Sequence, residues 1–277
     1  MKNVVLYDAY NLIYRARHAL PPKMQQSEWG ITFAFFRSLA ALNRQLKPDV
    51  AYFVTEGKPV HRLQLLPEYK GTRKHDSDDG FRRQRKEIIN IVSQYLPVVT
   101  VNHPEYECDD VIAHLAHFHA EQGDSVTVVS TDTDFLQLAN SIDGYKQYNP
   151  IRKKYVDLPE YDYVAWKALV GDSSDNIEGF YGIGNKRALK MLADPQKLQE
   201  FLDTEEKIDK YELNTILISF ARVSNPESMI TFTTGNNQWD LLRDLFTDMN
   251  FKSLVGDRGW SNFVDAFGCL EEANAAS

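Results

Sequence analysis

The sequence predicts an α/β fold with a mostly parallel central sheet. Short runs of β-branched and aromatic residues alternate with stretches whose apolar residues recur every three to four positions, which is the pattern of strands joined by helices. Acidic residues gather directly after several of these runs, and an open sheet of this class places its ligands at the carboxyl ends of its strands. We therefore expect one sheet with helices packed on its faces.

The expected elements follow one another in a regular order along the first half of the chain. A strand is expected where a short apolar run ends at a polar turn, and a helix where an amphipathic repeat begins. Asp109 is expected to cap the helix that stops before Gly123. In order, we expect a strand at 4–7, helices at 11–19 and 32–46, strands at 50–54 and 98–101, a helix at 109–121 and a strand at 125–130.

Two segments interrupt this alternation. Residues 58–86 are polar and basic and have no strand pattern, and residues 161–202 have helical character broken by four glycines. Residues 203–271 are expected to mix helix and loop, with Trp239 and Phe246 in the core. We expect no catalytic chemistry in that last region.

The composition is typical of a globular protein. The 277 residues suffice for one large domain or two small ones, and 43% hydrophobic with 25% charged residues exclude a disordered chain or a coiled coil. No apolar run approaches the roughly 18 residues of a membrane span, and the run within residues 1–8 is too short for a signal peptide. Cys108 and Cys269 cannot form a disulfide framework or a zinc ligand set. We therefore expect a cytoplasmic protein.

The net charge of −8 argues against nucleic-acid binding when it is taken alone. However, nine of the 39 acids lie where they could face divalent metal. Without these nine, 31 Lys and Arg residues stand against 30 acids. The acidic total is therefore compatible with a basic binding face.

The nine acids lie at five strand ends or turns. One such acid alone is typically a turn former or a helix cap. Nine acids are harder to explain in this way. The carboxyl ends of parallel strands lie at one edge of the sheet, so the nine carboxylates would repel one another there unless a cation compensates their charge. Carboxylates without His or Cys favour magnesium or manganese, and two such ions about 3.5–4 Å apart assist phosphoryl transfer. Asp172 and Asp175 are three apart, as neighbours on a helical turn would be. The candidate metal ligands are Asp8, Glu56, Glu107, Asp109, Asp110, Asp132, Asp134, Asp172 and Asp175.

Two further segments are candidates for binding nucleic acid. In residues 182–187, two glycines precede a helix-like run, so backbone amides can approach a phosphate at the start of that helix. Residues 67–73 combine an aromatic ring, on which a base can stack, with cations for phosphates. A plain turn and a solvated basic loop are the alternatives. The candidate nucleic-acid-binding residues are Tyr69, Lys70, Arg73, Gly182, Gly184, Lys186 and Arg187.

Two other features are interpreted as structural. His114 and His117 lie three apart in the helix expected at 109–121, but no His or Cys partner set surrounds them, so we expect surface positions. Cys108 lies between two candidate ligands and is expected to be a buried bystander rather than a nucleophile.

Together these motifs resemble a known family, the structure-specific 5′ nucleases. This family contains the flap endonucleases and the 5′-to-3′ exonucleases, and the resemblance is to its compact phage and bacterial form. It spans about residues 4–200, with weaker agreement to about 225. The matching segments, in the family's order, are residues 7–12 (YDAYNL), 66–73 (LPEYKGTR), 106–110 (YECDD), 130–135 (STDTDF), 171–177 (GDSSDNI) and 182–184 (GIG).

The resemblance implies a fold in more detail. Residues 1–158 would form a PIN-like nuclease core with a mostly parallel central sheet and a helical arch inserted at about 58–90. Residues 159–277 would carry a helix-hairpin-type element at about 160–202 that binds duplex DNA, with potassium at its carbonyls.

The resemblance also implies residue roles. The first metal site would be formed mainly by Asp8, Glu107 and Asp109, and Asp110 would lie near both sites. Acids at 132, 134, 172 and 175 would group around the second. Two cations at the base of the arch would steer the scissile phosphate, beside a tyrosine that stacks a base. The residues implied in catalysis are Lys70, Arg73, Asp8 and Asp110.

The sequence departs from the family pattern at two places. Glu56 stands where the family usually has Asp, which leaves the geometry of that ligand open. Glu178, Gly179 and Phe180 replace the usual Pro-Gly-Val before the Gly-Ile-Gly segment, and the extra negative charge would weaken the grip on a duplex.

The expected function is hydrolysis of phosphodiester bonds near a 5′ end, assisted by two magnesium ions with manganese as a substitute. The expected substrates are flap, nicked or duplex DNA and RNA–DNA hybrids, as in RNA-primer removal. We expect a monomer, with a polymerase or single-strand-binding protein as a separate partner. Two alternatives remain: a DNA-structure-binding protein that has lost its metal site, and a PIN-like RNA endonuclease.

Overall fold

The computed structural model describes residues 1–73, 78–224 and 229–270. A seven-stranded sheet has the order β6-β5-β4-β1-β2-β3-β9, in which β1 to β5 are parallel and the outer strands β6 and β9 are antiparallel. The predicted α/β class with a mostly parallel sheet is therefore confirmed. The strands are β1 Asn3–Asp8, β2 Val50–Val54, β3 Val99–Asn102, β4 Ser125–Val129, β5 Lys146–Asn149, β6 Lys154–Tyr155 and β9 Thr231–Thr234.

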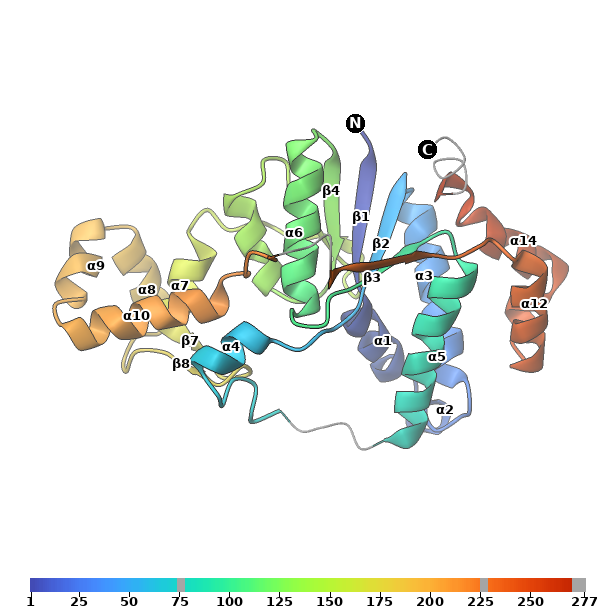
Figure 1. Ribbon diagram of the computed structural model, residues 1–277, viewed down its shortest axis with the longest axis horizontal. Helices are drawn as coiled ribbons and strands as arrows, with labels where there is room; N and C mark the ends of the chain where they lie inside the picture. Colours follow the sequence, from blue (N-terminus) through green and yellow to red (C-terminus); the bar gives the residue numbers. More distant parts are fainter. Residues whose placement is uncertain (74–77, 225–228, 271–277) are drawn as a thin grey trace.

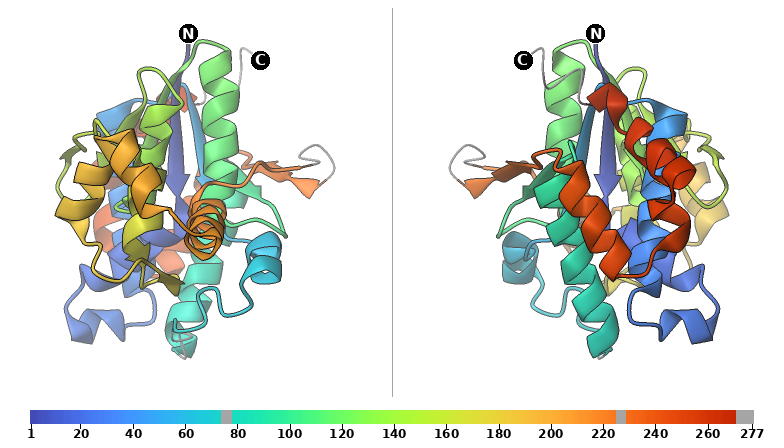
Figure 2. Two further views of the ribbon diagram at one scale, coloured as in Figure 1. Left: turned by 90° about the vertical axis from the view of Figure 1, so that its left-hand side faces the viewer. Right: turned by 90° about the vertical axis from the view of Figure 1, so that its right-hand side faces the viewer.

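Helices cover both faces of this sheet (Figures 1 and 2). On one face α6 packs its apolar side against the strands, and on the other face α1, α3 and α5 do so. Burial on both faces explains why β1 reads as an unbroken apolar run. The helices of this part are α1 Ala9–His18, α2 Pro22–Gln25, α3 Gly30–Leu46, α4 Val60–Leu65, α5 Asp79–Tyr95, α6 Cys108–Glu121 and the 3-10 helix η1 Asp134–Asn140.

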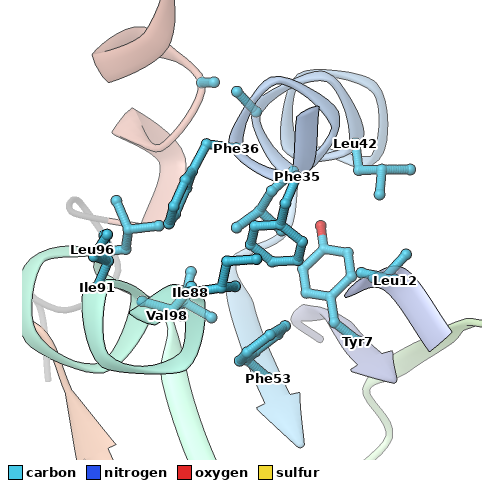
Figure 3. Close-up of a cluster of buried hydrophobic side chains, with 14 of the residues drawn as sticks. Tyr7, Leu12, Phe35, Phe36, Leu42, Phe53, Ile88, Ile91, Leu96 and Val98 are labelled. Carbon is cyan, nitrogen blue, oxygen red and sulfur yellow. The ribbon is translucent and has the colours of Figure 1, made fainter. Parts of the chain in front are cut away.

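The larger core lies between the sheet and the layer of α3 and α5 (Figure 3). Phe35, Phe36 and Phe53 form edge-on ring contacts there, at 5.2 and 5.7 Å between centroids. The hydroxyl of Tyr7 is satisfied by Asn43, at 2.6 Å. Three C-terminal helices close this core from outside: α12 Trp239–Asp248, α13 Lys252–Val255 and α14 Asp257–Asp265.

A separate group of helices extends to one side of the sheet (Figure 1). Its own small cores combine α7 and α8 around Leu169 and Met191, and α7 and α10 around Ala168 and Leu217. It contains α7 Tyr163–Val170, α8 Asn185–Leu192, α9 Pro195–Phe201, α10 Glu205–Ile218 and the small antiparallel pair β7 Gly171–Asp172 and β8 Ile177–Glu178.

Three elements differ from the expectations drawn from residue patterns. Those patterns place no helix at residues 79–95, although the resemblance implies a helical arch to about residue 90, and the structure has the long helix α5 there, capped by Asp78. The region after residue 203 contains β9, which pairs with β3. Asp172 and Asp175 do not share a helical turn, because Asp172 ends β7 and Asp175 lies in the turn before β8. Within the predicted arch at 58–90, residues 74–77 lie outside the described part of the chain, and the arch stays a prediction.

Within the described residues, we find no helix with the length and apolar character required to cross a membrane.

Candidate active site

Four of the candidate ligands lie at the carboxyl end of the parallel strands. Asp8 is the last residue of β1, and Glu56 follows β2. Asp109 stands in the first turn of α6, and Asp132 follows β4. All four line a cavity of about 1470 Å³, together with Cys108. Ligand atoms of Asp8, Cys108 and Asp109 lie within 4.8 Å of one another. The sheet thus gathers acids that are far apart in the sequence.

Asp8 is held by hydrogen bonds from two neighbouring segments. Its carboxylate caps α1 by accepting from the backbone N–H of Asn11 at 3.0 Å, and it accepts from the hydroxyl of Ser130 at 2.8 Å. The side-chain amide of Asn11 in turn donates to the hydroxyl of Thr131 at 2.8 Å. These bonds join the start of α1 to the end of β4, so the carboxylate is oriented before any ligand binds.

The electrostatics of this first group favour a bound cation. Burial, together with the carboxylates of Asp132 and Glu56, raises the pKa of Asp8 to about 6. Burial and the neighbouring Asp8 raise the pKa of Asp109 well above its usual value. A divalent ion would restore the ionised forms, because an opposite charge stabilises a carboxylate. Carboxylate oxygens in a shared cavity are donors that suit a hard divalent ion.

A second group of acids lies in the same cavity. Ligand atoms of Asp134, Asp172 and Asp175 lie within 4.8 Å of one another. Here protein cations already balance the charge: Lys167 pairs with Asp134 and, at 2.6 Å, with Asp172. Although burial opposes the shift, the hydrogen bond from Lys167 lowers the pKa of Asp172 to about 2. Burial and the carboxylate of Asp132 raise the pKa of Asp134, so within the second group the two acids that pair with Lys167 shift in opposite directions.

Asp110 and Glu107 do not line this cavity. Arg62 donates to both carboxylate oxygens of Asp110, at 2.7 and 2.8 Å, and the backbone N–H of Ala221 donates to one of them at 2.8 Å. Asp110 is fully buried and its oxygens are engaged, so it does not face the cavity in this structure. Its expected place near both metals stays a prediction. Glu107 likewise pairs with Arg62 and Lys70, so it acts here as an internal counter-ion.

Tyr69 does not lie where a base could stack on it. Its side chain is buried, with 5% exposure, in a cluster with Ala168 and Leu217. Its hydroxyl lies 3.1 Å from a carboxylate oxygen of Glu107 and 3.1 Å from one of Asp175. The expected stacking role is therefore corrected for this structure: the ring packs in a core, and the hydroxyl joins Glu107 to Asp175 of the second group.

Lys70 and Arg73 line the cavity, and their expected roles there stay predictions. Lys70 has a left-handed backbone, with φ of 56°, and its N–H donates to the carbonyl of Asp175 at 3.0 Å. This conformation is unfavourable for a residue with a side chain, so the surrounding contacts maintain it. The side chain of Lys70 pairs with Glu107, and that of Arg73 pairs with Asp175.

The segment 182–187 lies outside the cavity wall but is joined to it. Gly182 has φ of 73°, which suits glycine, and Gly184 caps the N-terminus of α8. The indole N–H of Trp166, which lines the cavity, donates to the side chain of Asn185 at 2.9 Å. The side chains of Lys186 and Arg187 are exposed beside this bond.

Sequence reasoning missed two cations of the site. Lys167 lies in the apolar run of α7, and a lone lysine within such a run is a signal for a buried ion pair. Arg62 was counted only as part of a basic segment. Cys108 is buried as predicted, and burial raises the pKa of its thiol. His114 and His117 are half-buried and line a second cavity of about 740 Å³.

The fold and the site together define a nuclease with acids at one edge of a parallel sheet and an attached helical unit. Residues 3–163 match the model of the 5′-3′ exonuclease N-terminal resolvase-like domain, and residues 158–228 match that of the 5′-3′ exonuclease C-terminal SAM fold. The chain belongs to the 5′-3′ exonuclease family, which confirms the resemblance and the 5′ nuclease class predicted from the motifs.

Related proteins include a 5′-3′ exonuclease of Aquifex aeolicus, 29% identical over 76% of this chain and 75% of its own length. DNA polymerase I of Mycobacterium tuberculosis is 31% identical over 74% of this chain, but the chain spans only about a quarter of that protein, 24%. Among solved structures, the fold is similar to that of the T5 D15 protein with metal ions (TM-score 0.65, 20% identity, 98% of this chain and 99% of that one). The catalytic core of Rad2 with a DNA substrate is more distant (TM-score 0.53, 15% identity, 89% and 88%).

Proposed function

We propose that this chain hydrolyses phosphodiester bonds near the 5′ ends of flap, nicked or duplex DNA, and of RNA–DNA hybrids, with two magnesium ions or with manganese in their place. The observation that carries the proposal is the cavity in which two groups of carboxylates meet Lys70 and Arg73. Acids bind hard divalent ions, and the two cations suit the charge of a phosphodiester.

The residues divide into two roles in this proposal. One ion would be held by the first group, Asp8, Glu56, Asp109 and Asp132, and the other by Asp134, Asp172 and Asp175. When bound, such ions neutralise phosphate charge and lower the pKa of water. Lys70 would stabilise charge on the phosphate, while Asn11 and Ser130 orient Asp8. Outside the cavity, Lys186 and Arg187 would bind the backbone of a duplex, with potassium at the nearby carbonyls.

Relatives support the choice of substrate. A structure of the bacteriophage T5 D15 flap endonuclease is described as a complex with DNA and metal ions, and the Rad2 core is described with a DNA substrate. We further propose that the chain acts as a monomer, and that any polymerase it works with is recruited as a partner. The relation to DNA polymerase I supports a role in replication and repair.

The test is cleavage of a labelled 5′-flap duplex, a 3′-flap duplex and single-stranded RNA, each with magnesium and with chelator. Magnesium-dependent cutting of the 5′ flap near its junction is the expected result, and the product sizes separate endonuclease from exonuclease activity. Binding of the flap without cutting would instead indicate a lapsed metal site, and cutting of only the RNA would indicate an RNA endonuclease.

A further inference from the structure

The β5–β6 hairpin, residues 146–155, is a strongly basic surface on an acidic protein. It carries four cations, Lys146, Arg152, Lys153 and Lys154, and no acid, whereas the whole chain has a net charge of −8. All four side chains are exposed. Across residues 1–73, 78–224 and 229–270, the ion pairs of the protein involve none of these four.

The cations of the cavity differ in this respect. Lys70 pairs with Glu107, Arg73 with Asp175, and Lys167 with acids of the second group. These three cations neutralise carboxylates of the protein itself. The hairpin cations have no such internal partner, so they are available to bind an anion from outside.

The hairpin is joined directly to the acidic edge of the sheet. β5 runs parallel to β4, with Tyr148 opposite Val129, so the turn begins where β4 ends. The side-chain amide of Gln147 donates to the backbone carbonyls of Ser130, at 3.3 Å, and of Asp132, at 2.5 Å. The base of the hairpin is therefore fixed to the loop that carries one of the candidate metal ligands.

The tip of the hairpin reaches the rim of the cavity. Ile151 lines the cavity and is nevertheless 63% exposed, as a rim residue would be. The side chain of Asn149 accepts from the backbone N–H groups of Ile151 and Arg152, at 3.0 and 2.9 Å. Lys153 follows with a left-handed backbone, φ 53°. These bonds fix the shape of the turn before a ligand arrives.

We propose that this basic hairpin binds the phosphates of a duplex arm at the rim of the cavity; the proposal rests on the proposed function and adds a binding surface to it. A duplex is favoured because it presents a phosphate charge about every 1.7 Å along its axis. Sites for single strands are grooves with stacking platforms. At the hairpin, the ring of Tyr155 meets Tyr148 edge-on at 5.5 Å, and the four cations are exposed around it.

The test compares two triple variants that remove the same number of charges. The hairpin variant carries Arg152→Ala, Lys153→Asn and Lys154→Ala, because Asn tolerates a left-handed backbone. The control carries Lys47→Asn, Lys252→Ala and Arg258→Ala. These three residues are exposed, and Lys47 has the same kind of backbone, with φ of 46°. Thermal unfolding shows whether both variants are folded.

Binding of a blunt duplex, a 5′-flap duplex and a single strand is then measured by fluorescence anisotropy in chelator over a range of salt. For the hairpin variant we expect roughly tenfold weaker duplex binding near 0.1 M salt. The salt dependence should become shallower by about 0.9 for each phosphate that the variant no longer neutralises. The control should bind as the wild type does.

Three results would overturn the proposal: an unchanged duplex affinity and slope, an equal loss in the control variant, or a loss confined to the single strand. The proposed function is tested separately by the wild type. If the wild type cuts flaps while the hairpin variant binds normally, only the hairpin assignment fails. If the wild type binds no nucleic acid, both proposals fail.

Discussion

Arg62 donates hydrogen bonds to both carboxylate oxygens of Asp110, at 2.7 and 2.8 Å. The side chains of this ion pair are 3% and 0% exposed. The remaining donors of the guanidinium reach Glu107 and the carbonyls of Leu217 and Ser219, at 2.7 to 2.9 Å. An arginine has five N–H donors, and all of them are satisfied here. One side chain therefore ties α4 to the start of α6 and the end of α10.

Removing Arg62 should therefore be strongly destabilising. Arg62→Ala leaves two buried carboxylates short of a counter-ion, which costs about 3–5 kcal/mol in comparable buried pairs. Urea unfolding followed by circular dichroism measures the loss. Arg82→Ala is the matched control, because the side chains of its pair with Asp79 are 51% and 89% exposed and the pair should contribute less than about 1 kcal/mol. A loss for Arg62→Ala no larger than for this control would refute the role of Arg62.

The effect of magnesium on stability should depend on pH. Because the pKa of Asp8 is raised to about 6, the folded protein holds this proton more tightly than the unfolded chain does. Without metal, stability therefore falls as the pH rises from about 4 through 6, by up to about 3 kcal/mol. Magnesium should offset this loss, so the rise in Tm on adding it should be larger at pH 8 than at pH 5. Calorimetry with magnesium, and with sodium chloride at equal ionic strength, checks this; equal shifts at both pH values would contradict it.

Asp132→Asn should abolish cleavage without abolishing binding. The amide oxygen can still accept from the backbone N–H of Asp134, as the carboxylate does at 2.9 Å, so the turn is preserved. The lost charge should lower the cleavage rate by at least about 100-fold, since metal-assisted stabilisation amounts to several kcal/mol. Single-turnover cleavage and binding in chelator are the measurements. Asp143→Asn changes an exposed acid and should have no effect. Wild-type turnover by Asp132→Asn would remove this residue from the metal site.

Lys186→Ala should weaken binding to duplex arms. Its side chain is exposed at the start of α8, where a phosphate contact is favoured by the helix N-terminus. The salt dependence of binding should become shallower by about one unit of slope. Lys197→Ala is the control, because Lys197 is exposed but pairs with Asp194 at 2.5 Å. An unchanged slope for Lys186→Ala would place this residue outside the interface.

Much of the fold and of the cavity could be predicted from local patterns. The runs at 4–7 and 50–54 are apolar because both faces of a parallel sheet are covered, and the acids that follow them meet at one edge. The roles of Tyr69 and Asp110 could not be predicted in this way. A motif identifies an acid, but whether that acid faces the cavity or an internal cation depends on Arg62, which is distant in the sequence.

The helix α5 shows a second limit. Its first turns carry several arginines, which resemble a solvated loop, and its apolar side becomes clear only from Ile88 onward. Phe81 is buried nonetheless, and Arg17 lies over its ring at 4.4 Å. Long charged side chains can cover apolar surface in this manner. The polarity of a segment therefore does not by itself show whether the segment is a helix or a loop.

The C-terminal helices have a consequence for the order of folding. Phe246 and Phe263 pack on the outer face of α3 and α5, and β9 adds to the free edge of β3. Each acid of the cavity precedes these elements in the chain. During synthesis, all of these acids therefore emerge from the ribosome before the C-terminal helices that pack on α3 and α5. Until then an apolar face and a strand edge remain open to other chains. The protection of this face and this edge against aggregation is therefore acquired only after the acidic side chains of the cavity have been synthesised.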